Sequence, residues 1–247
     1  MKLHRFLALL LIGSLTLPLS AKPKESGPRT VDSGSFGIFV SGRRVGTEKF
    51  SIRQDTHSSV ISSELKVDDG NYSADQTYEM RLQASGDLTR YEWRQLVPTD
   101  ASITVEPREQ FLVERSLTGK ESDKNKPIEQ PFLMPASSVI LDDFFFSQRQ
   151  VLLWRYLASA CRPKPGESGC ELPKAKFGAI IPRQRASAPV SVSYVANEFI
   201  TINGTPRQTN KFVISSEGSP EWSLWLDNDK KLIRVLIPSE ATEALRD

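Results

Sequence analysis

The chain has 247 residues, with 32 Lys and Arg, 30 Asp and Glu, and only two histidines. A formal net charge of +2 gives no strong electrostatic attraction to nucleic acid or to an acidic membrane surface, so neither is expected as a partner. So few histidines nearly exclude a zinc site built on a histidine cluster and a Ser–His or Cys–His nucleophile pair, and no metal or cofactor is expected.

The first 21 residues have the three-part pattern of a secretory signal peptide. Met1–Arg5 is positively charged, Phe6–Leu19 is an apolar run, and the small residue Ala21 marks the expected cleavage site. The apolar run is shorter than the roughly 20 residues that a membrane-spanning helix needs, and no second long apolar run follows. The sequence therefore predicts an exported protein, periplasmic or secreted, without a transmembrane span.

Residues 22–34 are polar and are expected to form a flexible lead-in to one β-rich domain over 35–247. Apolar residues then recur at every second position between turn sequences, which is typical of strands with one covered face. The strands predicted before the middle of the chain are Phe36–Val40, Val45–Ile52, Val60–Val67, Gln76–Leu82, Leu88–Leu96, Ile103–Val105 and Phe111–Val113. A charged loop over 119–127 follows them.

The period changes at residues 142–160, where a buried helix is predicted. Asp142 and Asp143 precede the apolar run and are expected to cap the helix through its free backbone N–H groups, rather than to act as an acid/base pair. Apolar side chains cover most of the circumference of this helix, which indicates burial on most sides.

Cys161 and Cys170 follow the predicted helix and enclose a loop sequence of eight residues. In an oxidising compartment this spacing favours one local disulfide over a redox pair. Strands are predicted again after the loop: Lys176–Ile181, Val190–Ala196, Phe199–Ile202, a strand containing Phe212–Ile214, Glu221–Leu226 and Leu232–Ile237. Asn203 and Gly204 predict a tight hairpin turn among them.

Two short hairpin sequences suggest a family. The first is Phe36–Val40, which leads through Gly42 to Val45–Glu48, and the second joins Leu224–Asp227 to Lys231–Val235. With the overall layout of strands around one apolar helix, they resemble the periplasmic half-barrels, which include the LolA/LppX-like lipoprotein and lipid carriers and related exported families of unknown function. The resemblance implies a mainly β (α+β) fold, a large curved antiparallel sheet wrapped around the helix, and sometimes an acyl chain on the concave face. It implies no catalytic residues.

The candidate ligand-binding residues are the large apolar side chains of the predicted helix, Phe144, Phe145, Phe146, Trp154 and Tyr156. They either line a pocket for a lipid or another apolar ligand, or fill the core and leave no pocket. The first interpretation predicts a binding or carrier protein. The second predicts a structural or interaction protein of the cell envelope, which contacts a protein partner through the charged 119–127 loop and the disulfide loop. An enzyme is not expected, because no motif presents a catalytic set.

Overall fold

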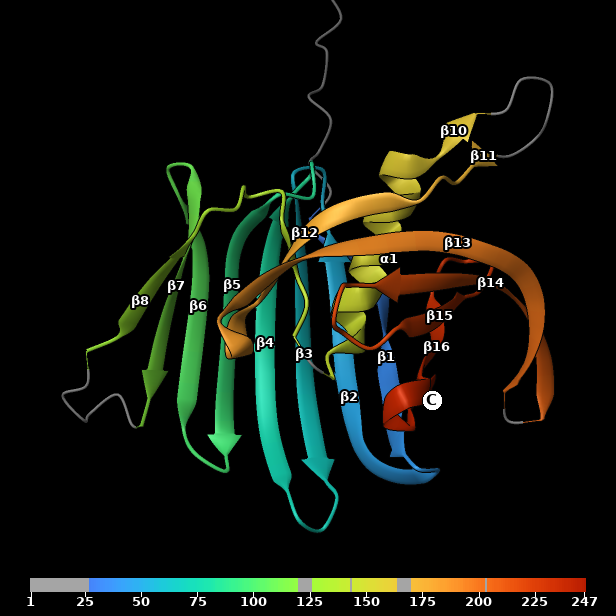
Figure 1. The fold of residues 1–247 in the computed structure, drawn as a ribbon, viewed down its shortest axis with the longest axis horizontal. Helices are drawn as coiled ribbons and strands as arrows, with labels where there is room; N and C mark the ends of the chain where they lie inside the picture. Colours follow the sequence, from blue (N-terminus) through green and yellow to red (C-terminus); the bar gives the residue numbers. More distant parts are fainter. Residues whose placement is uncertain (1–26, 120–125, 143, 164–169, 203) are drawn as a thin grey trace, which may run out of the picture.

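The computed structural model describes residues 27–119, 126–142, 144–163, 170–202 and 204–247 (Figure 1). Along the chain, strands both precede and follow one α-helix. Before the helix come β1 (Arg29–Val40), β2 (Arg43–Gln54), β3 (Ser58–Asp68), β4 (Ser73–Gln83), β5 (Leu88–Val97), β6 (Ala101–Arg108), β7 (Phe111–Thr118), β8 (Ile128–Phe132) and β9 (Val139–Ile140). The helix is α1 (Phe146–Ala160). After it come β10 (Arg162–Pro163), β11 (Cys170–Glu171), β12 (Ala175–Ile181), η1 (Pro182–Gln184), β13 (Ala186–Ile202), β14 (Thr205–Ser215), β15 (Trp222–Leu226), β16 (Leu232–Ile237), η2 (Pro238–Glu240) and β17 (Thr242–Arg246).

Fifteen strands form one sheet in the order β8-β7-β6-β5-β4-β3-β2-β1-β17-β16-β15-β14-β13-β12-β9. All neighbours are antiparallel except β12 and β9. Strands β8 and β9 are the edges of this order, and no strand pairing joins them in the described residues, so the sheet is open. The predicted fold class is confirmed at this level: the described chain is mainly β, with one helix and a large antiparallel sheet.

The period-two pattern of the sequence places the core. In β4, Ala74, Gln76, Tyr78 and Met80 are buried while the residues between them are partly exposed. The same alternation in the other long strands brings one face of the sheet against α1, and one large cluster of buried apolar residues joins the two. Each buried aliphatic or aromatic side chain there contributes about 1.5–3 kcal/mol relative to exposure.

The helix begins later than predicted. It spans Phe146–Ala160 instead of 142–160, and the residue before it, Phe145, makes no side-chain capping hydrogen bond. Asp142 therefore does not cap the helix, and Asp143 lies outside the described residues. The prediction was wrong because the first backbone N–H groups of the helix donate to a carboxylate of β2, which is distant in the sequence. A local capping pattern cannot show such a partner.

The predicted disulfide between Cys161 and Cys170 is present, with a Cα–Cα distance of 5.2 Å. The small sheet of β10 and β11 lies beside it. The predicted lead-in is partly wrong, because residues 29–34 belong to β1 and pair with β2. The predicted signal peptide over 1–21 lies outside the described residues, and so does most of the charged loop. Among the described residues, no helix is both long and apolar enough to cross a membrane.

The hairpin of β13 and β14 is long and bent (Figure 1). Its strands pair up to Ile202 and Thr205, on either side of the turn predicted from the sequence. The register shifts at Val195, as expected for a bulge that bends the strand. Beyond that point Ile200 and Ile202 join a second, smaller core cluster, whose other members are Trp225, Ile233 and the partly buried Leu236.

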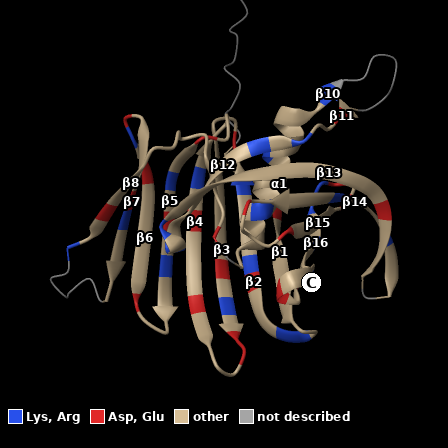
Figure 2. Cartoon of the chain, in the orientation of Figure 1, with Lys and Arg blue, Asp and Glu red and all other residues tan. Residues whose placement is uncertain are grey.

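Charged residues of both signs are distributed along the strands and turns of the sheet (Figure 2). Several of them form solvent-accessible pairs across strands, such as Arg115 with Glu129 and Lys66 with Asp75. Such pairs contribute about 0–1 kcal/mol each, so they do not decide the fold.

Candidate functional site

Two of three hollows in the described structure are poor candidates for an apolar site. One, of about 510 Å³, lies on the face of β2–β5 opposite the helix and is lined by charged residues such as Lys49, Glu64 and Arg94. The second, about 330 Å³, lies between Phe144 and the strands β12–β15, and includes the charged Arg149 and Glu240 in its wall.

The third hollow, which we call the α1 cavity, lies between α1 and the strands β3–β5. It encloses about 250 Å³. From the helix come Gln148, Val151, Leu152, Trp154, Arg155 and Ala158. These residues share one face because positions three and four apart are neighbours on a helix. The strands and loops contribute mostly small or apolar side chains: Gln54, Ser59, Met80, Leu82, Gln83, Ala84, Ser85, Gly86, Leu88, Ser138, Val139 and Ile140.

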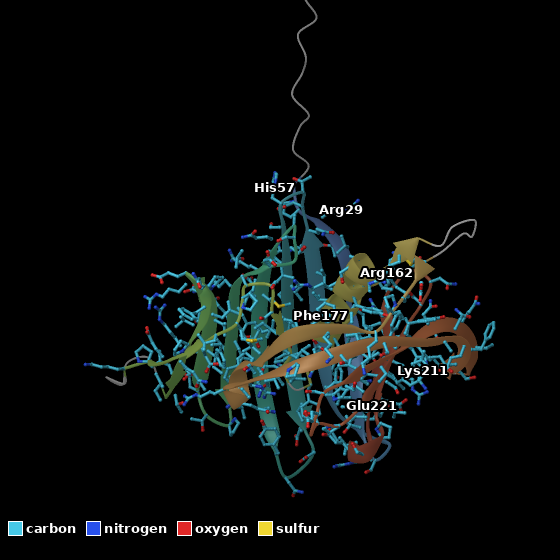
Figure 3. The ribbon with its side chains drawn as sticks, turned by 45° about the horizontal axis from the view of Figure 1, so that its top comes forward. Arg29, His57, Arg162, Phe177, Lys211 and Glu221 are labelled. Carbon is cyan, nitrogen blue, oxygen red and sulfur yellow. A yellow bond between two sulfur atoms is a disulfide. The ribbon has the colours of Figure 1, made fainter. Side chains whose placement is uncertain are left out.

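The burial of the lining residues shows which end of the α1 cavity is open. The turn residues Gln83–Ser85 and the helix residue Ala158 are exposed, so the mouth lies at the end of the sheet that holds the β2–β3 and β4–β5 turns. His57 marks that end in Figure 3, and its carbonyl oxygen accepts a hydrogen bond from the backbone N–H of Ala84. Gln148 and Leu152, which line the cavity nearer the N-terminus of α1, are almost completely buried.

A volume of about 250 Å³ limits what the α1 cavity holds. It lies just below the roughly 300–1,000 Å³ of typical ligand pockets. A cavity of about 150 Å³ accommodates benzene, so by proportion this one has room for roughly ten non-hydrogen atoms. A small apolar molecule or a segment of one acyl chain fits, whereas a whole diacyl lipid does not.

The structure separates the five predicted ligand-binding residues. Trp154 lines the α1 cavity, and its Nε1–H donates to the carbonyl oxygen of Lys230 at 2.6 Å. Phe144 lines the second hollow instead and has a positive φ of 59°. The other three, Phe145, Phe146 and Tyr156, are fully buried in the core. The sequence therefore identified the helix that borders the cavity, but only one of the side chains that face it.

A buried polar cluster at the N-terminal end of α1 was missed. Glu48 of β2 is fully buried, and its carboxylate accepts the backbone N–H of Phe146 at 2.6 Å and that of Ser147 at 3.3 Å. The same carboxylate accepts the hydroxyls of Ser63, at 2.9 Å, and of Ser147. Tyr78 completes the cluster through a hydrogen bond of 2.6 Å between its hydroxyl and that of Ser147. Glu48 therefore caps the helix in place of Asp142.

Burial changes the protonation of the carboxyl groups in this region. It raises the pKa of Glu48 to about 7, although the hydrogen bonds from Ser147, Ser63 and Phe146 act in the opposite direction. Burial also raises the pKa of Asp142, against the opposing effect of the Arg183 guanidinium. Asp142 accepts hydrogen bonds from the Tyr91 hydroxyl and, at 3.2 Å, from the Arg183 backbone N–H.

A second buried contact fixes the next turn of the helix. The Gln150 side chain donates to Asp32 of β1 at 2.6 Å and accepts the backbone N–H of Leu232 at 2.9 Å. Arg246 of β17 also donates to Asp32, at 2.6 Å. Because Asp32, Gln150 and Glu48 are all buried, each contact is shielded from water and anchors α1 to β1, β2 and β16.

The sequence did contain a signal for these anchors. Four consecutive polar residues of the helix, Ser147, Gln148, Arg149 and Gln150, are all buried. Together they cover every side of one helical turn, so some of them had to face the core. In β2, Glu48 lies two and four residues before Phe50 and Ile52, so all three side chains point to the same face of the strand. A charged residue therefore lies on the buried, mainly apolar face. Both observations require buried polar partners.

The polar cluster and the α1 cavity differ in their access to solvent. Ser147 and Glu48 are both fully buried and are hydrogen-bonded to each other. In the described part of the chain, no three His, Cys, Asp or Glu side chains are grouped so that they could hold a metal ion. The α1 cavity, by contrast, combines apolar walls with an open mouth.

Comparisons of the chain with protein-family models, with curated proteins and with solved structures found no match.

Proposed function

We propose that this chain is an exported, non-enzymatic binding protein, periplasmic or secreted, that holds a small apolar ligand or part of one acyl chain in the α1 cavity. In this proposal the open sheet is a half-barrel wrapped around α1, as in the LolA/LppX-like carriers that the sequence resembles. The observation that supports it best is the α1 cavity itself, which is about 250 Å³, has mostly apolar walls, and opens at one end of the sheet.

The arrangement of α1 also supports binding beside the helix. The first two turns are anchored through Glu48 and Asp32, while the cavity extends from Gln148 along the helix to Ala158. A ligand can therefore enter beside the C-terminal half of the helix without breaking the anchors. A cavity lined by apolar groups gains affinity from desolvation of the ligand, about 25 cal/mol per Å² of apolar area buried.

Native mass spectrometry tests the proposal first. The protein, purified gently from the compartment to which it is exported, should carry extra mass that organic extraction releases as an apolar molecule. Titration with butylbenzene, which has the size estimated for the cavity, tests the same site without the native ligand. Saturable binding of butylbenzene supports the proposal.

Two neighbouring substitutions localise the site. Ala158 lines the cavity mouth, and Ser159 is exposed beside it but does not line the cavity. Ala158→Phe should lower the affinity for butylbenzene at least tenfold by filling the mouth, whereas Ser159→Phe, the matched control, should leave it unchanged. If neither protein nor variant binds, or if the two variants behave alike, the α1 cavity is not the binding site.

A second candidate function is an interaction protein of the cell envelope. Its support is the bent β13–β14 hairpin, where Phe199 is 72% exposed and Val195 is 51% exposed. The contact segments predicted from the sequence, the 119–127 loop and the disulfide loop, lie largely outside the described residues. If this function is right, Phe199→Ser should abolish co-purification with an envelope partner, and Thr201→Ser on the same strand should not.

A further inference from the structure

Two side chains that line the α1 cavity each carry a buried polar atom without a hydrogen-bond partner. The atoms are the hydroxyl oxygen of Ser138 and the amide nitrogen Nε2 of Gln148. Both side chains are almost completely buried, with 3% and 1% of their surface exposed. Buried polar groups are normally hydrogen-bonded, so two unpaired groups on side chains that line one cavity require an explanation.

The orientation of the Gln148 amide is fixed by the protein. Its oxygen Oε1 accepts the backbone N–H of Asp142 at 2.6 Å, so the NH₂ group is the part left without a partner. The amide therefore offers hydrogen-bond donors, and the Ser138 hydroxyl offers one more. Two unpaired donor groups in a mostly apolar wall match a ligand that brings an acceptor.

We infer that the ligand of the α1 cavity is an apolar molecule with one uncharged carbonyl group, such as a ketone, ester or amide. This inference rests on the proposed function. The carbonyl oxygen accepts hydrogen bonds from Gln148 Nε2 and from the Ser138 hydroxyl at the buried end of the cavity. The apolar remainder contacts Leu152 and Val151 and extends towards the mouth beside Ala158.

The charges around the cavity favour an uncharged carbonyl over a carboxylate. Arg155 is the one charged side chain among the described residues that line it. Its guanidinium already donates to the carbonyl oxygen of Gly86 at 3.2 Å and lies 3.7 Å from the Asp87 carboxylate, both at the mouth. A carboxylate at the buried end would meet only neutral donors, and burying an unpaired charge is far more costly than burying a hydrogen-bonded carbonyl.

Three probes of equal size separate these possibilities. Propiophenone carries a ketone, phenylacetate carries a carboxylate, and butylbenzene carries no acceptor, and all three have the same number of non-hydrogen atoms. Affinities are measured by calorimetry for the full protein, for Ser138→Ala and for Gln148→Glu. The last variant keeps the oxygen that Asp142 requires and removes the donor. Ser59→Ala, another serine of the same cavity, is the matched control.

The expected result is selective for the ketone. Ser138→Ala should weaken propiophenone about fivefold, the effect of one ordinary hydrogen bond. It should leave butylbenzene within twofold, and Ser59→Ala should change neither. Gln148→Glu should weaken propiophenone more than butylbenzene. Because the Ser138 hydroxyl has no protein partner, Ser138→Ala should fold normally even if Gln148→Glu does not.

Other results overturn the inference in distinguishable ways. If Ser138→Ala leaves propiophenone unchanged while both neutral probes still bind, a water molecule satisfies the two donors, and the carbonyl inference is wrong although the proposed function stands. Tighter binding of phenylacetate than of propiophenone also overturns it. If no probe binds the unmodified protein, the proposed function fails, and the inference fails with it.

Discussion

Glu48 offers the sharpest test of how this fold holds its helix. Replacing it with alanine removes the acceptor of the Phe146 and Ser147 backbone N–H groups, and nothing else in the described contacts replaces it for Phe146. A buried donor left without a partner costs about 1–3 kcal/mol, so the two together predict a loss of roughly 2–6 kcal/mol. The Ser63 hydroxyl also loses its acceptor, but it can rotate.

Glu48→Gln keeps the shape and is expected to behave differently at different pH. The pKa of Glu48 is raised from 4.5 to about 7 in the folded protein, chiefly by burial. Between these values the folded state holds a proton that the unfolded state has released, so stability falls as pH rises through this window. The difference corresponds to about 3 kcal/mol. Glutamine imitates the protonated form and cannot lose that proton.

The assay is urea unfolding at pH 5 and pH 8, followed by tryptophan fluorescence. Glu48→Gln should lie within about 1 kcal/mol of the unmodified protein at pH 5 and exceed its stability by up to about 3 kcal/mol at pH 8. Glu114, whose pKa burial also raises to about 7, keeps its own pH dependence in both proteins. The exposed Glu64→Gln variant is the control. If Glu48→Gln loses more stability at pH 8 than at pH 5, the buried carboxylate is ionised and the reasoning is wrong.

Three further substitutions test other parts of the structure by the same unfolding assay. Phe145→Ala should cost about 3–5 kcal/mol because the ring is fully buried; a cost below about 1 kcal/mol would mean that the ring does not fill the core. Cys161→Ser with Cys170→Ser should cost about 3 kcal/mol at most, the entropy of closing a loop this short, and should preserve the fold by circular dichroism. Asp32→Asn should cost about 2 kcal/mol at pH 7, because it removes a buried carboxylate that accepts hydrogen bonds from Arg246 and Gln150. Burial alone would raise the pKa of Asp32, but these hydrogen bonds outweigh burial and lower it. That cost should shrink as the pH falls below 3.8, the ordinary value, and a cost independent of pH would contradict the ion pair.

The strands could be predicted because each one shows its alternation of apolar and polar residues within its own short segment of sequence. In β3, Ile61 and Leu65 are buried and Glu64 and Lys66 are exposed, which is the alternation visible in the sequence. The disulfide was predictable for the same reason, because eight residues of loop sequence suffice to bring two cysteines together. The start of β1 at Arg29 was not, since its first residues are polar and are held by pairing with β2.

The capping of α1 could not be predicted from local pattern. Asp142 precedes the helix by only four residues, but Glu48 is 98 residues away from the N–H group that it accepts. The capping rule identified the right kind of acceptor, a carboxylate, and assigned it to the wrong residue. Local pattern also could not separate the candidate ligand-binding residues that fill the core from those that border a hollow. Phe145, Phe146 and Tyr156 fill the core, whereas Trp154 and the small Ala158 line the α1 cavity.

Gln148 is the residue at which the anchoring of α1 and the proposed binding meet. Its oxygen accepts a hydrogen bond from the Asp142 backbone N–H, which supports the fold, while its nitrogen has no hydrogen-bond partner and is the donor that we assign to the proposed ligand. A substitution that removes both atoms therefore changes the stability of the fold and the affinity for the proposed ligand together, so the two effects cannot be separated. Ser138 has no such double role, because its hydroxyl makes no hydrogen bond within the protein. For this reason an affinity lost in Ser138→Ala, without a loss of stability, is the observation that most directly connects this fold to a ligand.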